Sequence, residues 1–169
     1  FQAENLHNDF KIFGDNIITP DEYHFWRNAF QLTSAKRRKI WGSTKIIMGS
    51  FYSGRRTDWL IQSGCKISVP VFLGFESDRR WVSLPAGDFV AQIYRVNLNI
   101  HINPDISLYN FAQYENQTET IGLQSRFQWI IKPGKEIFLT FNSPMIDPME
   151  RFKTETFEAR MKLKYTIRF

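Results

Sequence analysis

The sequence has 169 residues, of which 43% are apolar and 16% aromatic, with 22 Lys and Arg against 17 Asp and Glu. This apolar content argues against a disordered chain, and the lack of any run of about 18 apolar residues excludes a transmembrane helix. The net charge of +5 comes without a long basic patch, so the sequence predicts no nucleic-acid partner.

Strand-like alternation of apolar and polar residues is nearly continuous after residue 22. Residues 1–20 precede it as an N-terminal segment, which supplies either a loop or one further strand at Asp9–Gly14. Residues 21–169 then predict nine strands, near residues 23–34, 40–52, 57–67, 71–79, 90–102, 106–116, 120–131, 136–145 and 157–169.

The last predicted strand, Phe157–Phe169, alternates most regularly. Successive strand side chains point to opposite faces, so one face of this strand is apolar and the other is charged or polar. About 9–11 residues are enough for a strand to cross a bilayer, and this segment is long enough. The apolar face consists of Phe157, Ala159, Met161, Leu163, Tyr165, Ile167 and Phe169.

The predicted connections fall into two sets. Short turns are expected at Ser34–Arg37, around Pro70, at Asn103–Asp105 and at Lys132–Lys135. Longer polar loops are expected at Ser53–Arg56, Ser77–Asp88, Glu115–Glu119 and Ser143–Thr154. Short turns at one end and longer loops at the other are typical of outer-membrane barrels. The sequence therefore predicts an all-β, antiparallel, up-and-down transmembrane β-barrel, or the C-terminal part of a larger one, since nine strands is an odd number.

Seven basic residues lie on the polar faces of the predicted strands. In a barrel they would line the lumen, where cationic side chains favour anions. The alternative is that they pair with Glu76, Glu115 and Glu158 and fill a closed interior. The seven predicted lumen-facing residues are Lys45, Arg95, Arg126, Arg160, Lys162, Lys164 and Arg168.

No catalytic, metal or cofactor site is predicted, and the chain is not expected to be an enzyme. His7, His24 and His101 are dispersed without metal-ligand spacing, and Cys65 is interpreted as a small packing residue. No nucleophile motif or phosphate-binding glycine loop occurs. The five tryptophans are predicted to anchor strand ends at the membrane interface, with stacking on a sugar as the alternative.

Five stretches carry a resemblance to a known family: GSFYSGRR (Gly49–Arg56), VSLPAGDF (Val82–Phe89), LYNFAQYENQ (Leu108–Gln117), LQSRFQWIIKPGKEIFLTFN (Leu123–Asn142) and the closing EARMKLKYTIRF. The most specific pattern is R-F-x-W-x-x-x-P-G-x-E-I-F, from Arg126 to Phe138. The chain resembles the C-terminal barrel, a domain of unknown function, of bacterial outer-membrane proteins frequent in Bacteroidota. Those proteins commonly carry an N-terminal domain related to family 9 carbohydrate-binding modules.

The resemblance implies a longer parent protein in the outer membrane of a Gram-negative bacterium. Its implied partners are the lipid bilayer and the outer-membrane assembly machinery, with other outer-membrane or periplasmic proteins as a further option. Phe169, with Tyr165 and Ile167 on its face, resembles the C-terminal signal that this machinery uses. The family supplies no catalytic residues.

Three functions are compatible with the sequence. The first is an outer-membrane barrel domain that acts as a membrane anchor, a pore or a partner-binding component. The second is a soluble β-barrel that holds an apolar ligand, in which case the apolar faces point inward. The third is an outer-membrane hydrolase, which the missing nucleophile motif disfavours.

Overall fold

The computed structural model describes residues 2–13, 16–146, 153–154 and 156–166, and every regular element in these ranges is a strand. The strands are β1 (Gln2–Asn5), β2 (Phe10–Phe13), β3 (Asn16–Ile18), β4 (Glu22–Phe25), β5 (Arg27–Thr33), β6 (Ile40–Phe51), β7 (Gly54–Ser68), β8 (Val71–Leu84), β9 (Gly87–Asn103), β10 (Ile106–Glu115), β11 (Thr120–Lys132), β12 (Lys135–Ile146), β13 (Lys153–Thr154) and β14 (Glu158–Tyr165).

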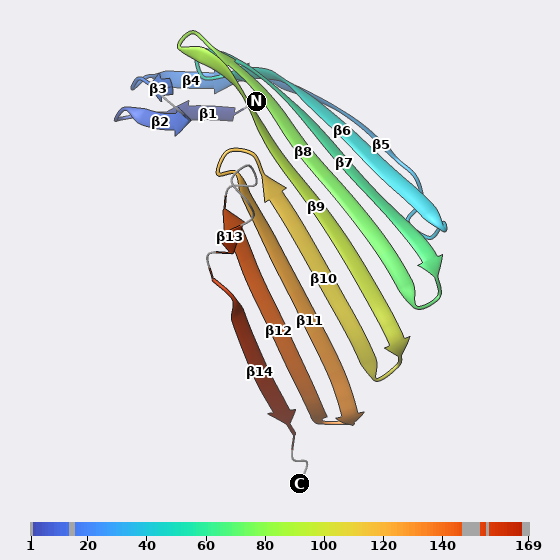
Figure 1. Cartoon of the computed structure of the whole chain (residues 1–169). Coiled ribbons are helices and arrows are strands. Elements are labelled where there is room, and N and C mark those ends of the chain that lie inside the picture. The colour runs from blue at the N-terminus through green and yellow to red at the C-terminus, as the bar shows by residue number, and fades with distance from the viewer. Residues whose placement is uncertain (1, 14–15, 147–152, 155, 167–169) are drawn as a thin grey trace.

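One large sheet contains most of the chain. Strands β5 to β12 each pair antiparallel with the next strand along the sequence, as Figure 1 shows. Both β13 and β14 pair with the outer edge of β12, where Met145 is opposite Thr154 and Lys135 is opposite Tyr165. The predicted all-β, antiparallel, up-and-down arrangement is confirmed.

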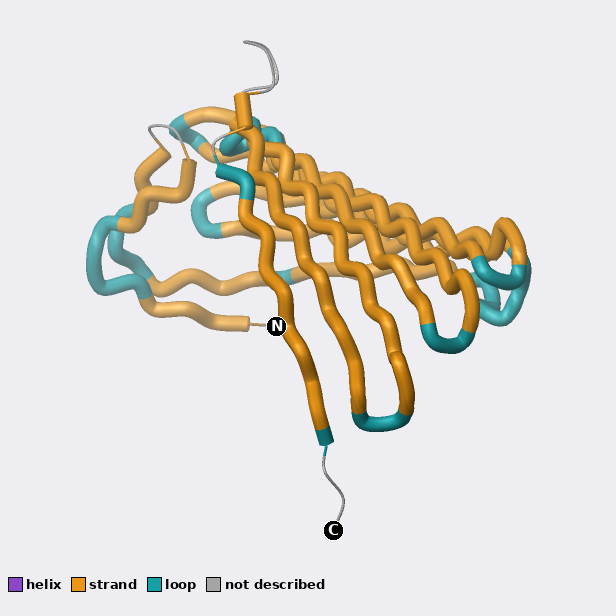
Figure 2. Tube along the Cα trace, turned by 60° about the horizontal axis from the view of Figure 1, so that its bottom comes forward, coloured by secondary structure: helices purple, strands orange, loops and turns teal. Residues whose placement is uncertain are grey.

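The sheet is curved but open. Among the described residues no pairing joins β5 to β14, so both edges of the sheet are free. Figures 1 and 2 show a curved sheet, and in Figure 1 the N-terminal strands lie beside the end of the sheet where β8 finishes. Closure into a barrel therefore stays a prediction.

The predicted difference between short turns and long loops is wrong. Two-residue connections occur at both ends of the sheet: Tyr52–Ser53 and Pro85–Ala86 at one end, Val69–Pro70 and Pro104–Asp105 at the other. The predicted loop Ser77–Asp88 is mostly strand, because β8 runs to Leu84 and β9 starts at Gly87. Much of the longer connection after β12 lies outside the described residues, so loop length gives no support for a membrane orientation.

The predicted strand 23–34 is two strands in different sheets. β4 pairs with β1, whereas β5 pairs with β6, and the break falls at Trp26. Gly49 of β6 makes this break possible, because a Cβ there would lie 1.9 Å from the carbonyl oxygen of Trp26. The expected strand at Asp9–Gly14 exists as β2, but it pairs with β3 and not with the large sheet.

The register of the large sheet defines two faces. The concave face carries Asp58, Asp78 and Arg95, and the convex face carries Trp59 and Leu98. Ile18 of β3 packs against Val82 and Leu84 on the concave face, so the N-terminal strands lie on the polar side of the sheet. This contact holds the only cluster of buried apolar residues in the described part of the chain.

Large apolar side chains are exposed on the convex face of each long strand of the sheet except β10. Leu32 on β5 is 75% exposed and Leu163 on β14 is 66% exposed, and strands between them show the same pattern. The register therefore puts most of the exposed apolar side chains on the convex face and most of the charged ones on the concave face, although Leu60, Ile93 and Phe111 are concave and Arg79 is convex. Exposed residues of the convex face include Phe30, Ile46, Met48, Leu73, Phe75, Val96, Leu123, Phe141 and Met161.

Candidate functional site

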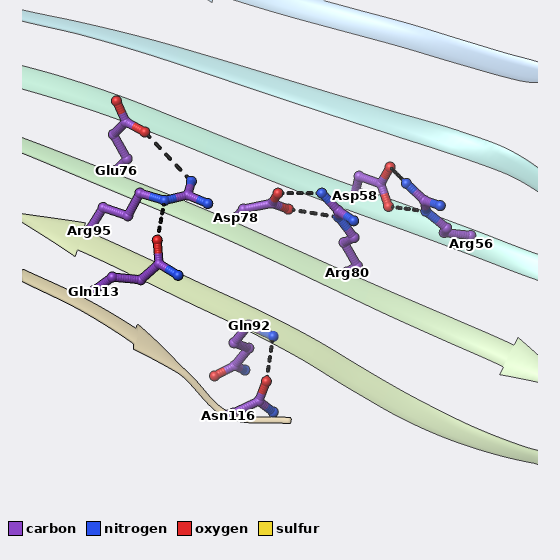
Figure 3. Close-up of polar contacts among 9 residues, drawn as sticks. All are labelled: Arg56, Asp58, Glu76, Asp78, Arg80, Gln92, Arg95, Gln113 and Asn116. Atoms are coloured by element: carbon purple, nitrogen blue, oxygen red, sulfur yellow. Dashed lines mark hydrogen bonds and ion pairs between the residues drawn. The ribbon is translucent and has the colours of Figure 1, made fainter. Parts of the chain in front are cut away.

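A ladder of paired charges crosses the concave face at β7 and β8 (Figure 3). Arg56 and Asp58 are two residues apart on one strand, so they share a face. The Nε and Nη2 atoms of Arg56 each donate a hydrogen bond of 2.6 Å to the carboxylate of Asp58, which is only 5% exposed. The two strands thus bury a bidentate ion pair, the strongest kind of charged hydrogen bond between side chains.

The ladder continues on β8. The register places Arg80 opposite Asp58, and Arg80 donates two hydrogen bonds to Asp78, with Nε at 3.0 Å and Nη2 at 2.5 Å. Arg56, Asp58, Arg80 and Asp78 therefore alternate in sign across two strands and compensate one another. We call these four residues the charge ladder.

Arg95 on β9 extends the polar network beyond the charge ladder. Its Nε donates a 2.8 Å hydrogen bond to Gln113 of β10, and its guanidinium lies 3.7 Å from the carboxylate of Glu76 (Figure 3). This is one of the pairings expected for a filled interior. Glu115, expected to pair in the same way, has no ion pair with any described residue.

Six of the seven predicted basic residues share the concave face, and Arg168 lies outside the described residues. Arg160 pairs with Glu158 and Lys164 pairs with Glu136 at 2.9 Å. Within the described ranges Lys45, Arg126 and Lys162 form no ion pair. The register that places all six on this face runs continuously from β5 to β14.

Sequence reasoning missed the charge ladder. Arg56 and Arg80 fall in predicted loops, Ser53–Arg56 and Ser77–Asp88, whereas Asp58 falls in the predicted strand 57–67, and none of these charges was assigned to a face. A signal was present, because Arg56 and Asp58, and again Asp78 and Arg80, have opposite charges two residues apart. That spacing is what a strand needs to neutralise charges on one of its own faces.

A hollow remains between β2 and the concave face. Its volume is about 340 Å³, and its lining combines apolar side chains of Ile12 and Val82 with the polar groups of Arg56, Arg80 and Glu115. The N-terminal strands thus cover the charge ladder without filling all the space above it.

The remaining candidate side chains have structural contacts. His101 shares a 3.0 Å hydrogen bond between its Nδ1 and the Ser107 hydroxyl. In the described ranges no three His, Cys, Asp or Glu side chains come together as a metal site would need. Trp59 and Trp81 stack on the convex face with ring centroids 6.4 Å apart, and Trp59 Nε1 donates to Thr44 Oγ1 at 2.9 Å.

Comparison with protein-family models gave no match, and comparisons with curated proteins and with solved structures gave none either. The resemblance to outer-membrane barrel domains therefore rests on the sequence motifs alone and stays a prediction. No helix long and apolar enough to span a membrane occurs in the part of the chain that the structure describes.

Proposed function

We propose that this chain forms part of the wall of an outer-membrane β-barrel, with its convex face in lipid and its concave face toward the lumen. The observation that carries the proposal is the exposed convex face, where apolar side chains from β5 to β14 lack any covering layer in the described structure. Contiguous exposed apolar patches larger than a few hundred Å² are rare on soluble monomers. In a transmembrane barrel such a surface is covered by lipid.

The direction of curvature supports this orientation. The sheet bends toward the face that carries the charge ladder, and the N-terminal strands pack on that face. A barrel closed in the same sense has a polar interior. A soluble lipid-binding barrel needs the opposite arrangement, with its apolar face inside.

Strand length fits the same proposal. The strands β7, β8 and β9 contain 15, 14 and 17 residues. About 9–11 residues cross a bilayer, so these strands span it and extend beyond it. The free edges at β5 and β14 must be paired in lipid, because unpaired backbone groups are costly there. We propose that further strands, from the rest of the polypeptide or from another subunit, complete the barrel.

The covered concave face favours an anchor over a wide open pore. The N-terminal strands pack onto one end of this face through Ile18, Val82 and Leu84, and the charge ladder beneath them is internally neutralised. Both features reduce the space and the unpaired charge available to a passing ion. We therefore propose a membrane anchor or a partner-binding wall as the main role.

Heat-modifiable migration of the protein extracted from membranes with detergent tests the proposal. A closed, detergent-stable barrel migrates faster unboiled than boiled, and this is the expected result. Release into the aqueous fraction without detergent, together with identical migration before and after boiling, would overturn it. That second outcome would mean that the apolar face is buried inside a soluble barrel.

A further inference from the structure

The basic side chains of the concave face differ between its two halves. On β7 to β9, Arg56, Arg80 and Arg95 each lie beside a carboxylate. On β11 to β14, Arg126 and Lys162 have no acidic partner within the described ranges, and Arg160 has one, Glu158. Lys45 on β6 also has no acidic partner among the described residues, but on β11 to β14 two such side chains, Arg126 and Lys162, lie close in register to Arg160. We call Arg126, Arg160 and Lys162 the C-terminal basic patch.

Arg126 is held in place by an aromatic ring, and its guanidinium donates no hydrogen bond to another described residue. Its guanidinium carbon lies 4.8 Å from the centroid of the Tyr109 ring, a cation–π contact with the neighbouring strand. A guanidinium has five N–H donors in a planar fork that matches an oxyanion. The side chain is exposed, so solvent or a ligand can reach these donors.

The sheet register aligns Arg126 with a second arginine. Arg126 is opposite Thr140 on β12, and Thr140 is opposite Arg160 on β14. Neighbouring strands lie roughly 4.8 Å apart, so the two arginine backbones are roughly 10 Å apart with the threonine hydroxyl between them. Thr140 forms no side-chain hydrogen bond with another described residue, and Lys162 follows Arg160 by two residues on the same face.

We propose that the C-terminal basic patch, together with Thr140, binds an oxyanion group of a solute that reaches the concave face. The chemical class is a carboxylate, sulfate or phosphate. The guanidiniums and the ammonium group can only donate hydrogen bonds, and the hydroxyl can donate as well, so the ligand must supply acceptors and negative charge. The arginines of the charge ladder hold carboxylates through two hydrogen bonds each, and Arg160 likewise contacts Glu158, so Arg126 and Lys162 supply most of the uncommitted donors of the patch. The site depends on the register of β10 to β14 and not on closure of the barrel, so it goes beyond the proposed function.

The test uses the protein folded in detergent micelles, with sodium acetate, sulfate and phosphate as separate probes against chloride at constant ionic strength. The midpoint of thermal unfolding is followed as the probe concentration rises. A saturable increase with at least one of the three oxyanions is expected. Arg126→Gln should reduce that increase several-fold, and Arg126→Lys should reduce it less, because the charge remains while the fork is lost.

Lys45→Gln is the matched control. It removes the same charge from the same face, but on β6, far from the patch in strand order. This variant should retain the full increase. The proposal is overturned if the unaltered protein shows no saturable increase, or if Lys45→Gln and Arg126→Gln reduce it equally. If Arg126→Gln does not fold, Arg160→Gln replaces it, because the Arg160 side chain is 72% exposed. A failure here leaves the heat-modifiability result unaffected, so the two proposals can fail separately.

Discussion

The ion pair between Arg56 and Asp58 shows how single residues stabilise the concave face. Removing one partner of a buried pair leaves an uncompensated charge, which costs more than the pair itself contributes. The Arg56 side chain is 21% exposed and Asp58 is nearly inaccessible, so the remaining guanidinium would be only partly hydrated.

We expect Asp58→Asn to lower the free energy of unfolding by about 2–4 kcal/mol. Urea unfolding in detergent micelles, followed by tryptophan fluorescence, measures this value. Glu158→Gln is the control, because its ion pair with Arg160 is exposed and should contribute at most about 1 kcal/mol. Equal losses in the two variants would contradict a special role for the buried pair.

Glycine at position 64 has a packing role. A Cβ there would lie 2.4 to 2.7 Å from the indole of Trp41, so this ring covers the bare backbone of β7. We expect Gly64→Ala to cost about 1–3 kcal/mol through overpacking and to change the Trp41 emission. Gly122→Ala is the control, because nothing lies within 4 Å of the added carbon. A Gly64→Ala variant as stable as the control would refute this role.

Tyr52, in the turn between β6 and β7, connects the sheet to β1. Burial raises the pKa of its phenol above the ordinary value, and the nearby Glu4 carboxylate, 3.4 Å from the hydroxyl, raises it further. Because the pKa is raised, the contact between β1 and the sheet is more stable when the phenol is neutral than when it is ionised. The stabilisation is therefore complete below about pH 10, the ordinary tyrosine value, and is lost as the pH rises through the higher folded-state pKa.

Alkaline titration of the tyrosinate absorbance tests this sign. The unaltered protein should contain one tyrosine that ionises above the others, and Tyr52→Phe should remove that late step. If the late step persists in Tyr52→Phe, another tyrosine causes it and the assignment is wrong.

At the scale of elements, the N-terminal strands attach to the large sheet through a small apolar contact. Ile18 is 3% exposed, whereas its neighbour Ile17 is 53% exposed. Tyr23 and Phe25 of β4 extend the contact through edge-to-face ring pairs with Tyr52, at 5.0 and 5.4 Å between centroids. The N-terminal strands thus have few contacts compared with the continuous strand pairing of the large sheet.

We expect Ile18→Asp to release the N-terminal strands while the large sheet keeps its structure. The buried isoleucine contributes about 1.5–3 kcal/mol, and a carboxylate in its place adds a desolvation cost. Trypsin cleavage after Lys11 should become much faster. Trypsin should cleave the Ile17→Asp variant at the rate of the unaltered protein, because the Ile17 side chain is already exposed to solvent. Unchanged cleavage of Ile18→Asp would show that the N-terminal strands are held by other contacts.

The strands β7 and β8 show where sequence patterns mislead. Residues 53–56 and 77–88 are rich in polar residues, and loops are usually polar, so the sequence predicts loops that include Arg56 and Arg80. In the folded sheet Arg56 and Asp58, like Asp78 and Arg80, neutralise each other within one strand. Paired charges of this kind do not interrupt a strand, so both strands continue to the two-residue turns.

At the scale of the whole molecule, the sheet separates an apolar convex face from a polar concave face. Leu98 and Asn97 are adjacent in sequence and lie on opposite faces of β9. They therefore provide a paired test of which medium each face contacts.

We expect Leu98→Arg to lower the free energy of unfolding from phospholipid vesicles by about 2–4 kcal/mol, as arginine does near the middle of a bilayer. Asn97→Arg should change it by less than about 1 kcal/mol, because a lumen accepts a hydrated charge. Unfolding with urea from preformed vesicles gives both values. If Leu98→Arg is neutral, the convex face does not lie in lipid.

The sequence alone determined the local properties of this protein. Alternation in Phe157–Phe169 and in residues 120–131 predicted strands and their faces, because side-chain direction along a strand depends only on the pleat. The six described basic residues predicted for one face lie together for the same reason.

Only the tertiary structure decided which of these residues meet. Arg95 reaches Glu76, 19 positions earlier, whereas Arg126 faces Tyr109 and finds no described acid, and both outcomes depend on the register between strands. Tertiary structure also decided that β1 to β4 lie on the concave face, because Gly49 and the pairing of β4 with β1 turn the chain away at Trp26. Register and curvature are properties of several strands at once, so no single segment of sequence contains them.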